Sequence, residues 1–167
     1  MTKYATAILT LLIATTLVFS AKRTALALPD YKKEFFNIYV DKTATEAHAK
    51  AFAEAANAKT GKCFVCHVNV KKLDEQGLKS KSVRNNYGKA ITQFIDKDSF
   101  KAMKKEDKEK AMAALREAIE KTGDLKADPS DPDSPTFGEL IESGKLPGDG
   151  KPDPEDLEKA KAARDSK

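Results

Sequence analysis

The sequence predicts an all-α protein, a small domain of four to five short helices. Three observations favour this class. Apolar residues recur at the i, i+3, i+4 spacing of one helix face in several segments. Alanine, the best helix former, is dense over residues 41–59. No segment shows the strict apolar–polar alternation that is typical of a half-buried strand.

Residues 1–27 are predicted to be a secretory signal that precedes the fold. Residues 5–19 are apolar and uncharged, and Ala25–Ala27 has the small residues of a cleavage site. The apolar run is shorter than the about 20 residues of a membrane span. We therefore expect a periplasmic or otherwise exported protein with no membrane attachment after cleavage. Lys22 and Arg23 lie between the run and the cut, which keeps an uncleaved anchor as the alternative.

The charge balance gives no case for nucleic acid as a partner. The whole chain has 30 basic and 26 acidic residues. The predicted signal holds Lys3, Lys22 and Arg23 and no acidic residue. Without it the net charge falls from +4 to nearly zero, so any electrostatic steering would come from local patches.

The first two helices are predicted over residues 28–40 and 41–59. The first is rich in aromatic residues at helical spacing and begins near Pro29 or Asp30. The second has Thr43 or Thr45 as cap and stops before Gly61. Its predicted apolar stripe consists of Ala44, Ala47, His48, Ala51, Phe52 and Ala55.

Two more helices are predicted over residues 89–95 and 100–122, the latter capped by Ser99 and ended by Gly123. Together these segments make a domain over residues 28–123. Six of the seven prolines lie beyond it, between Pro129 and Pro154. Within residues 124–147 we predict one short helix, over 135–147, that docks on the domain. Residues 148–167 have little to bury and are predicted to be a mobile tail.

The most specific feature is Cys63-Phe64-Val65-Cys66-His67. Cys-x-x-Cys-His is the attachment sequence of c-type haem. On a helix, positions i, i+3 and i+4 share one face, so both sulfurs and the imidazole can reach one flat ligand. Cys63 and Cys66 would bind the haem vinyl groups, and His67 would be an axial ligand of the iron.

Zinc and redox-dithiol interpretations of this motif are disfavoured. A closed zinc site needs about four ligands, and the chain has only two Cys and two His. A thioredoxin-like dithiol would need a βαβ setting, which the sequence does not indicate.

The second axial position has several candidates. His48 is the only other histidine, and Met103 and Met112 lie downstream of the motif. An open or water-filled position is the remaining alternative. Methionine beside histidine raises the reduction potential, whereas an open position could bind small gases or peroxide. The alternative without a ligand role places His48 at the edge of the core and assigns Met103 and Met112 to core packing.

A second motif, Arg84-Asn85-Asn86-Tyr87-Gly88, follows. One interpretation assigns Arg84 and Tyr87 to the haem propionates, because a guanidinium pairs well with a carboxylate. The favoured interpretation is a loop-to-helix junction, with Asn85 or Asn86 as cap and Gly88 at a close backbone contact.

The chain resembles small monohaem c-type cytochromes, and more narrowly the short exported cytochromes of planctomycete-type bacteria. Three segments carry this resemblance: Lys62–His67, Arg84–Gly88 and Phe137–Pro147. It implies a cytochrome c-like fold around one covalent haem c, with one-electron transfer between redox protein partners and no enzyme activity. The alternatives are a haem enzyme or gas-binding protein with an open distal side, and an assembly subunit whose haem is structural.

Overall fold

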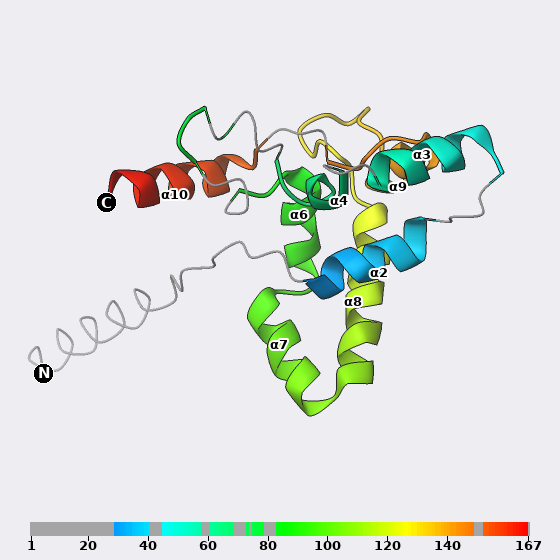
Figure 1. The fold of residues 1–167 in the computed structure, drawn as a ribbon, viewed down its shortest axis with the longest axis horizontal. Helices are drawn as coiled ribbons and strands as arrows, with labels where there is room; N and C mark the ends of the chain where they lie inside the picture. Colours follow the sequence, from blue (N-terminus) through cyan, green and yellow to red (C-terminus); the bar gives the residue numbers. More distant parts are fainter. Residues whose placement is uncertain are drawn as a thin grey trace, which may run out of the picture.

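The computed structural model describes residues 29–40, 45–57, 61–68, 73, 75–78, 83–148 and 152–166. In this part the protein is mostly helical, which confirms the all-α prediction at the level of class (Figure 1). The predicted signal, residues 1–27, lies outside the described residues. Among the helices described, none combines the length and the apolarity that crossing a membrane requires.

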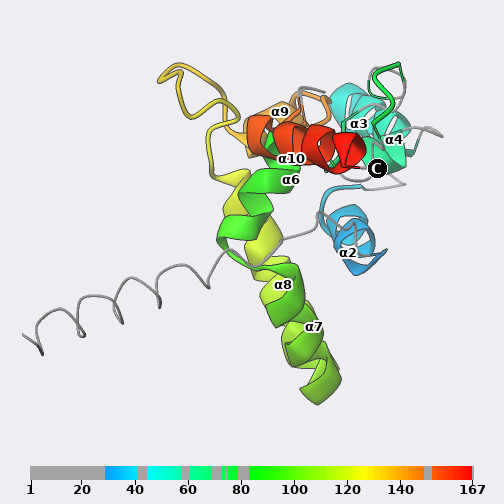
Figure 2. The same ribbon diagram turned by 90° about the vertical axis from the view of Figure 1, so that its left-hand side faces the viewer.

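Helix α2, Pro29–Tyr39, confirms the first predicted helix. It packs across the long helix α8, Lys108–Gly123 (Figures 1 and 2). Its Phe35 is 1% exposed and holds the centre of the main core. The Phe35 ring lies 6.2 Å from that of Phe52 and 5.7 Å from that of Tyr87, both edge to face. Burying such a ring contributes about 1.5–3 kcal/mol, so α2 is fixed by its aromatic face.

Helix α3, Ala47–Asn57, begins later than predicted and turns a different face to the core. Phe52 and Ala56 are buried, whereas His48 is exposed. The prediction that His48 lies on the apolar stripe is therefore wrong. Alanine occurs on nearly every side of this helix, so the alanines leave its rotation undetermined, and the one large apolar side chain, Phe52, sets it.

The next helices are short, and the first of them contains the start of the Cys-x-x-Cys-His segment. Helix α4 spans Gly61–Phe64, helix α6 spans Asn86–Ala90, and a 3-10 turn, η2, covers Ile91–Gln93. Helix α6 begins three residues before the predicted start at residue 89 because Asn85 caps it: its side chain accepts a hydrogen bond from the Gly88 amide.

The helix predicted over 100–122 is in fact a hairpin of two helices. Helix α7 spans Lys97–Glu106 and helix α8 spans Lys108–Gly123, and they pack along each other (Figure 1). Asp107 separates them with extended backbone and caps α8 by accepting from the Lys110 amide. Asp96, and not Ser99, caps α7. Carboxylate caps of this kind satisfy amides that the first turn leaves unpaired.

Helix α9, Phe137–Glu142, confirms the short docked helix predicted within residues 135–147. Thr136 and Glu139 form a capping box at its start. Phe137 and Ile141 are buried, and α9 packs on α3 and α8. The Phe137 ring lies 5.1 Å from the Tyr87 ring, edge to face, so this segment closes the main core from the side opposite α2.

The mobile tail predicted over 148–167 is replaced by helix α10, Pro154–Asp165. Leu157 and Ala160 of this helix pack on a second apolar cluster formed by Val68, Leu73, Leu78 and Val83. Asp156 is buried and pairs with Arg84. Helix α10 therefore docks through a few specific contacts. Its mostly polar composition does not indicate them, so the sequence alone did not predict that it docks.

Candidate haem-attachment site

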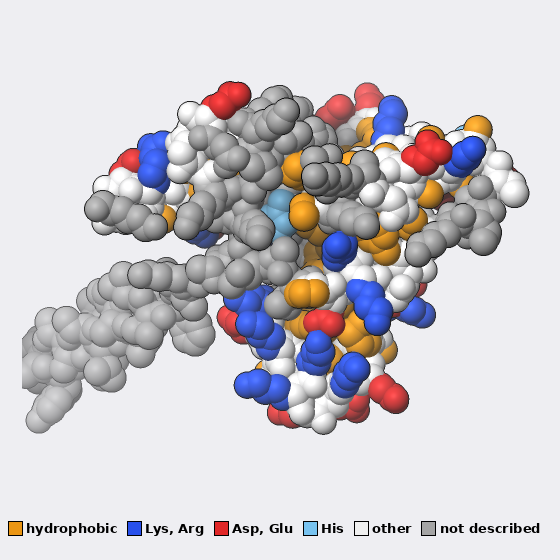
Figure 3. Space-filling model, viewed as in Figure 1, with side chains coloured by type: hydrophobic (Ala, Val, Ile, Leu, Met, Phe, Trp, Pro, Cys, Tyr) orange, Lys and Arg blue, Asp and Glu red, His pale blue; other side chains and the backbone are white. Residues whose placement is uncertain are grey.

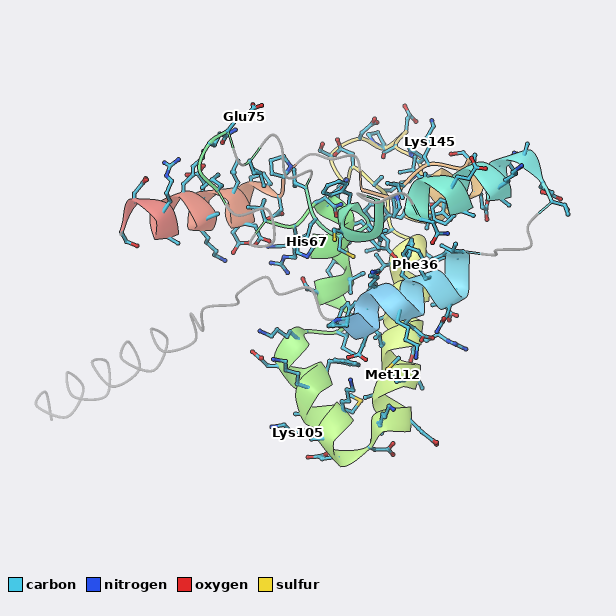
Figure 4. All side chains as sticks on the ribbon, viewed as in Figure 1. Phe36, His67, Glu75, Lys105, Met112 and Lys145 are labelled. Carbon is cyan, nitrogen blue, oxygen red and sulfur yellow. The ribbon has the colours of Figure 1, made fainter. Side chains whose placement is uncertain are left out.

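The three residues of the predicted attachment site lie on one continuous turn. Cys63 is in α4, and the His67 amide donates to the Cys63 carbonyl at 3.1 Å, as in one further helical turn. Cys63 is exposed, Cys66 is half-buried against the main core, and His67 is 6% exposed. Figure 3 shows a histidine side chain beside apolar side chains on the face toward the viewer, at the place where Figure 4, in the same view, labels His67.

The His67 ring is held by the segment that precedes α6. Its Nδ1 lies 3.2 Å from the carbonyl oxygen of Val83. A carbonyl can only accept, so Nδ1 carries the proton in the neutral ring and Nε2 carries the lone pair. A metal-ligating histidine commonly has this second hydrogen bond, which fixes its tautomer and ring orientation. The Val83 carbonyl therefore orients the His67 ring through Nδ1.

The two thiols differ in their surroundings. Burial raises the pKa of the Cys66 thiol to about 12, so it is protonated at neutral pH. Redox-active and metal-binding thiols are usually thiolates with lowered pKa values. The raised pKa of Cys66 argues against the redox-dithiol alternative. The sulfur of Cys66 lies close enough to Tyr31 and Tyr87 to add to the increase in their pKa values, which burial chiefly causes.

Residues 83–85 pair with the attachment segment along its backbone. The Asn85 amide donates to the Cys66 carbonyl at 3.1 Å, and the Val68 amide reaches the Val83 carbonyl at 3.4 Å. A Cβ atom at Gly88 would lie 2.1 Å from the Cys66 carbonyl oxygen, so no side chain fits there. The favoured interpretation of the second motif, with Asn85 as the cap and Gly88 at a close contact, is confirmed.

Arg84 and Tyr87 are both engaged in the fold. Arg84 binds Asp156 through Nε at 2.6 Å and through its second guanidinium nitrogen at 2.8 Å. Tyr87 is fully buried between aromatic rings, and its hydroxyl is a buried polar atom without a hydrogen-bond partner among the described residues. A buried hydroxyl that lacks a partner costs about 1–3 kcal/mol, so an acceptor from a bound group beside Cys66 would stabilise the site.

Of the candidate distal ligands, His48 and Met112 lie away from His67. The His48 side chain is 62% exposed and lies 3.9 Å from Glu46. It is in the first turn of α3, and nine residues of helix, about 13 Å, separate it from the end that leads to α4. Met112 lies on the other side of α2 from His67 in Figure 4. Met103 packs on the main core and lines a cavity between η2, α7 and α8.

A cavity of about 610 Å³ lies along α2 and borders the end of α3. Apolar Phe36 and Val40 line it together with Lys32, Lys33 and Asn57. This volume falls in the range of sites for cofactors and drug-sized ligands. Phe36 and Cys66 both pack on the main core, so the cavity and the attachment segment border the same cluster.

No group of three or more His, Cys, Asp or Glu residues suited to holding a metal ion occurs among the described residues. A haem iron differs from such a site, because the porphyrin supplies the ligands in its plane and the protein adds only the axial ones. No family model, no curated protein and no solved structure matches this chain. Its function therefore has to be argued from its own residues.

Sequence reasoning missed two contributions to the site. Asp156, which holds Arg84, lies in the segment predicted to be mobile, and no local pattern distinguishes it from the neighbouring acidic residues. The role of Asn85 beyond capping was also missed, although its motif was singled out. Both depend on contacts between segments distant in sequence.

Proposed function

We propose that the chain is an exported monohaem c-type cytochrome that carries single electrons between redox protein partners. Cys63 and Cys66 would bind haem through thioether bonds, and His67 would be its proximal ligand. The observation that carries the proposal is the Cys-x-x-Cys-His turn, in which the Val83 carbonyl orients the His67 ring through Nδ1.

Two features of the described residues support a bound porphyrin. The Tyr87 hydroxyl has no partner among the described residues, and Phe36 and Val40 form an apolar part of the lining of the cavity along α2. Lys32 and Lys33 on its border offer ammonium groups for carboxylates such as the propionates. Bound haem would supply the one-electron Fe(III)/Fe(II) couple. The protein's part would be to orient His67, limit water at the iron and set the potential through ligation and burial.

A second candidate function is favoured by one observation. The described residues do not bring His48 or Met112 near His67. A haem held only by His67 would have an open distal side, and the protein would then bind a small gas or peroxide. The two functions differ in the sixth ligand, which spectra identify directly.

The test begins with expression in a host that matures c-type cytochromes. Mass spectrometry should show one covalently bound haem, and the double variant Cys63→Ala, Cys66→Ala should lose it. A colourless protein with both thiols unmodified would overturn the proposal.

The coloured protein then separates the two functions. A carrier with both axial positions filled should be low-spin and bind carbon monoxide slowly. A high-spin protein that binds carbon monoxide rapidly and turns over peroxide supports the second function. His48→Ala should leave either spectrum unchanged, because His48 is exposed.

A further inference from the structure

The side chain of Asn85 is buried beneath the attachment turn and is 0% exposed. Its amide nitrogen donates to the carbonyl oxygens of Phe64 at 3.0 Å and Val65 at 3.1 Å, and lies 3.4 Å from that of His67. Its Oδ1 accepts from the Gly88 amide at 2.8 Å. One carboxamide thus bridges the start of α6 and the backbone of the Cys-x-x-Cys-His turn.

Two glycines hold this carboxamide in place. A Cβ atom at Gly148 would lie 1.9 Å from Asn85 Nδ2, and one at Gly88 would lie 2.1 Å from the Cys66 carbonyl oxygen. The backbone therefore approaches Asn85 and the turn as closely as glycine allows. A larger residue at Gly148 would displace the Asn85 amide.

Helix capping alone does not explain these contacts. A cap needs only an acceptor for the amides of the first turn, and Asp or Ser serves as well as Asn. The contacts to Phe64 and Val65 use the two N–H donors, which capping does not need. Their carbonyls are at the end of α4, where a helix leaves oxygens without internal partners. The Asn85 amide satisfies those oxygens.

We propose that Asn85 is a positioning residue for haem attachment. Its carboxamide holds residues 64–67 in one turn before haem is bound, which keeps Cys66 packed inward and His67 in reach of the Val83 carbonyl. The consequence for haem rests on the proposed function. The ordering of the turn does not, and it can be tested in the haem-free chain.

The test compares Asn85→Asp and Asn85→Ser with the unsubstituted full chain. Both replacements keep an acceptor for the Gly88 amide and remove the two donors. The matched control is Asn86→Asp. Asn86 has the same side chain one residue later, but it donates to Ala127 at 2.6 Å, away from the turn.

The first measurement is the rate at which a thiol reagent modifies each cysteine of the haem-free chain, with site-resolved mass spectrometry. We expect Cys66 to react at least tenfold faster in both Asn85 variants. Exposed Cys63 should keep its rate, and Asn86→Asp should change neither. Equal rates at the two cysteines in the unsubstituted chain, or an unchanged Cys66 rate in the Asn85 variants, would overturn the proposal.

The second measurement uses the haem-loaded protein. Loosening the turn allows several imidazole orientations, so the electron paramagnetic resonance lines of the oxidised Asn85→Ser protein should broaden, with a lower yield of covalent haem. Asn86→Asp should give the unsubstituted spectrum. Identical lines and yield in Asn85→Ser would refute the role at the haem. A chain that never acquires haem would defeat the proposed function instead, and the thiol rates would still decide whether Asn85 orders the turn.

Discussion

Removing the Asp156 carboxylate should detach helix α10 and destabilise the protein. Asp156 is the acceptor for the Arg84 guanidinium at 2.6 and 2.8 Å, and it also accepts from the Arg84 backbone amide at 3.3 Å. The side chains are 13% and 2% exposed for Arg84 and Asp156, respectively. Asp156→Ala would leave the guanidinium largely buried without its counter-charge.

The size of the expected loss in unfolding free energy follows from this geometry. Breaking a buried ion pair by removing one partner costs roughly 3–5 kcal/mol. Some water reaches Arg84, so we take the lower end, about 3 kcal/mol. With an m-value of about 2 kcal/mol/M, the midpoint of urea unfolding, followed by far-ultraviolet circular dichroism, should fall by about 1.5 M.

The loss should also depend on pH. Burial disfavours the Asp156 carboxylate, but the hydrogen bonds and charge of Arg84 outweigh it and lower its pKa. A lowered pKa contributes stability above the unfolded value of about 3.9, and this contribution disappears as the pH falls through the folded value. The difference in unfolding free energy between the unsubstituted protein and Asp156→Ala should therefore be largest at pH 7 and decrease below about pH 4.

The control is Glu155→Gln on the adjacent residue. Glu155 pairs with Lys89 and Lys159 at the surface, so its replacement should leave the midpoint nearly unchanged. Replacing both partners, Arg84→Met with Asp156→Leu, should recover most of the stability, because no buried charge is then left alone. If Asp156→Ala and Glu155→Gln unfold at the same urea concentration, α10 is not held by this pair.

Three further predictions concern the main core and the attachment turn. Gly88→Ala should cost about 3 kcal/mol in thermal unfolding, since its Cβ would meet the Cys66 carbonyl at 2.1 Å. Gly123→Ala, whose Cβ would contact only the end of a tyrosine side chain, should cost less than about 1 kcal/mol; equal costs would contradict the close contact. Tyr87→Phe should stabilise the haem-free chain by about 1 kcal/mol in urea, because it removes an unpaired buried hydroxyl, and a clear loss would show that the hydroxyl has a partner. Leu115→Ala, at 0% exposure, should cost about 3 kcal/mol and leave unfolding cooperative; a change under about 0.5 kcal/mol would place Leu115 outside the core.

Structural features that depend on residues a few positions apart could be predicted from the sequence. The aromatic helix at Pro29–Tyr39, the end of α8 at Gly123 and the short helix after Thr136 all follow from spacing, caps and stops within a few residues. The prediction of a helix cap at Asn85 or Asn86 was of the same kind and is confirmed at Asn85. The Cys-x-x-Cys-His spacing also identified the candidate site, and its assignment to haem stays a prediction.

Features that depend on packing between distant segments could not be predicted from the sequence. The rotation of α3 was mispredicted because its many alanines carry almost no directional information, so His48 was assigned to the buried face. The hairpin of α7 and α8 was predicted as one helix because Asp107 lies among other charged residues, and nothing in the sequence marks it as a break. In the structure its backbone is extended and separates the two helices.

Local patterns were enough to predict a helical protein with one Cys-x-x-Cys-His turn, since helix periodicity and motif spacing are properties of neighbouring residues. What holds that turn depends instead on contacts in the folded protein. The Val83 carbonyl at His67, the Asn85 amide beneath residues 64–65 and the Arg84–Asp156 pair join segments between 16 and 72 residues apart. Such contacts form only when the packed core brings these segments together, and no local pattern encodes them.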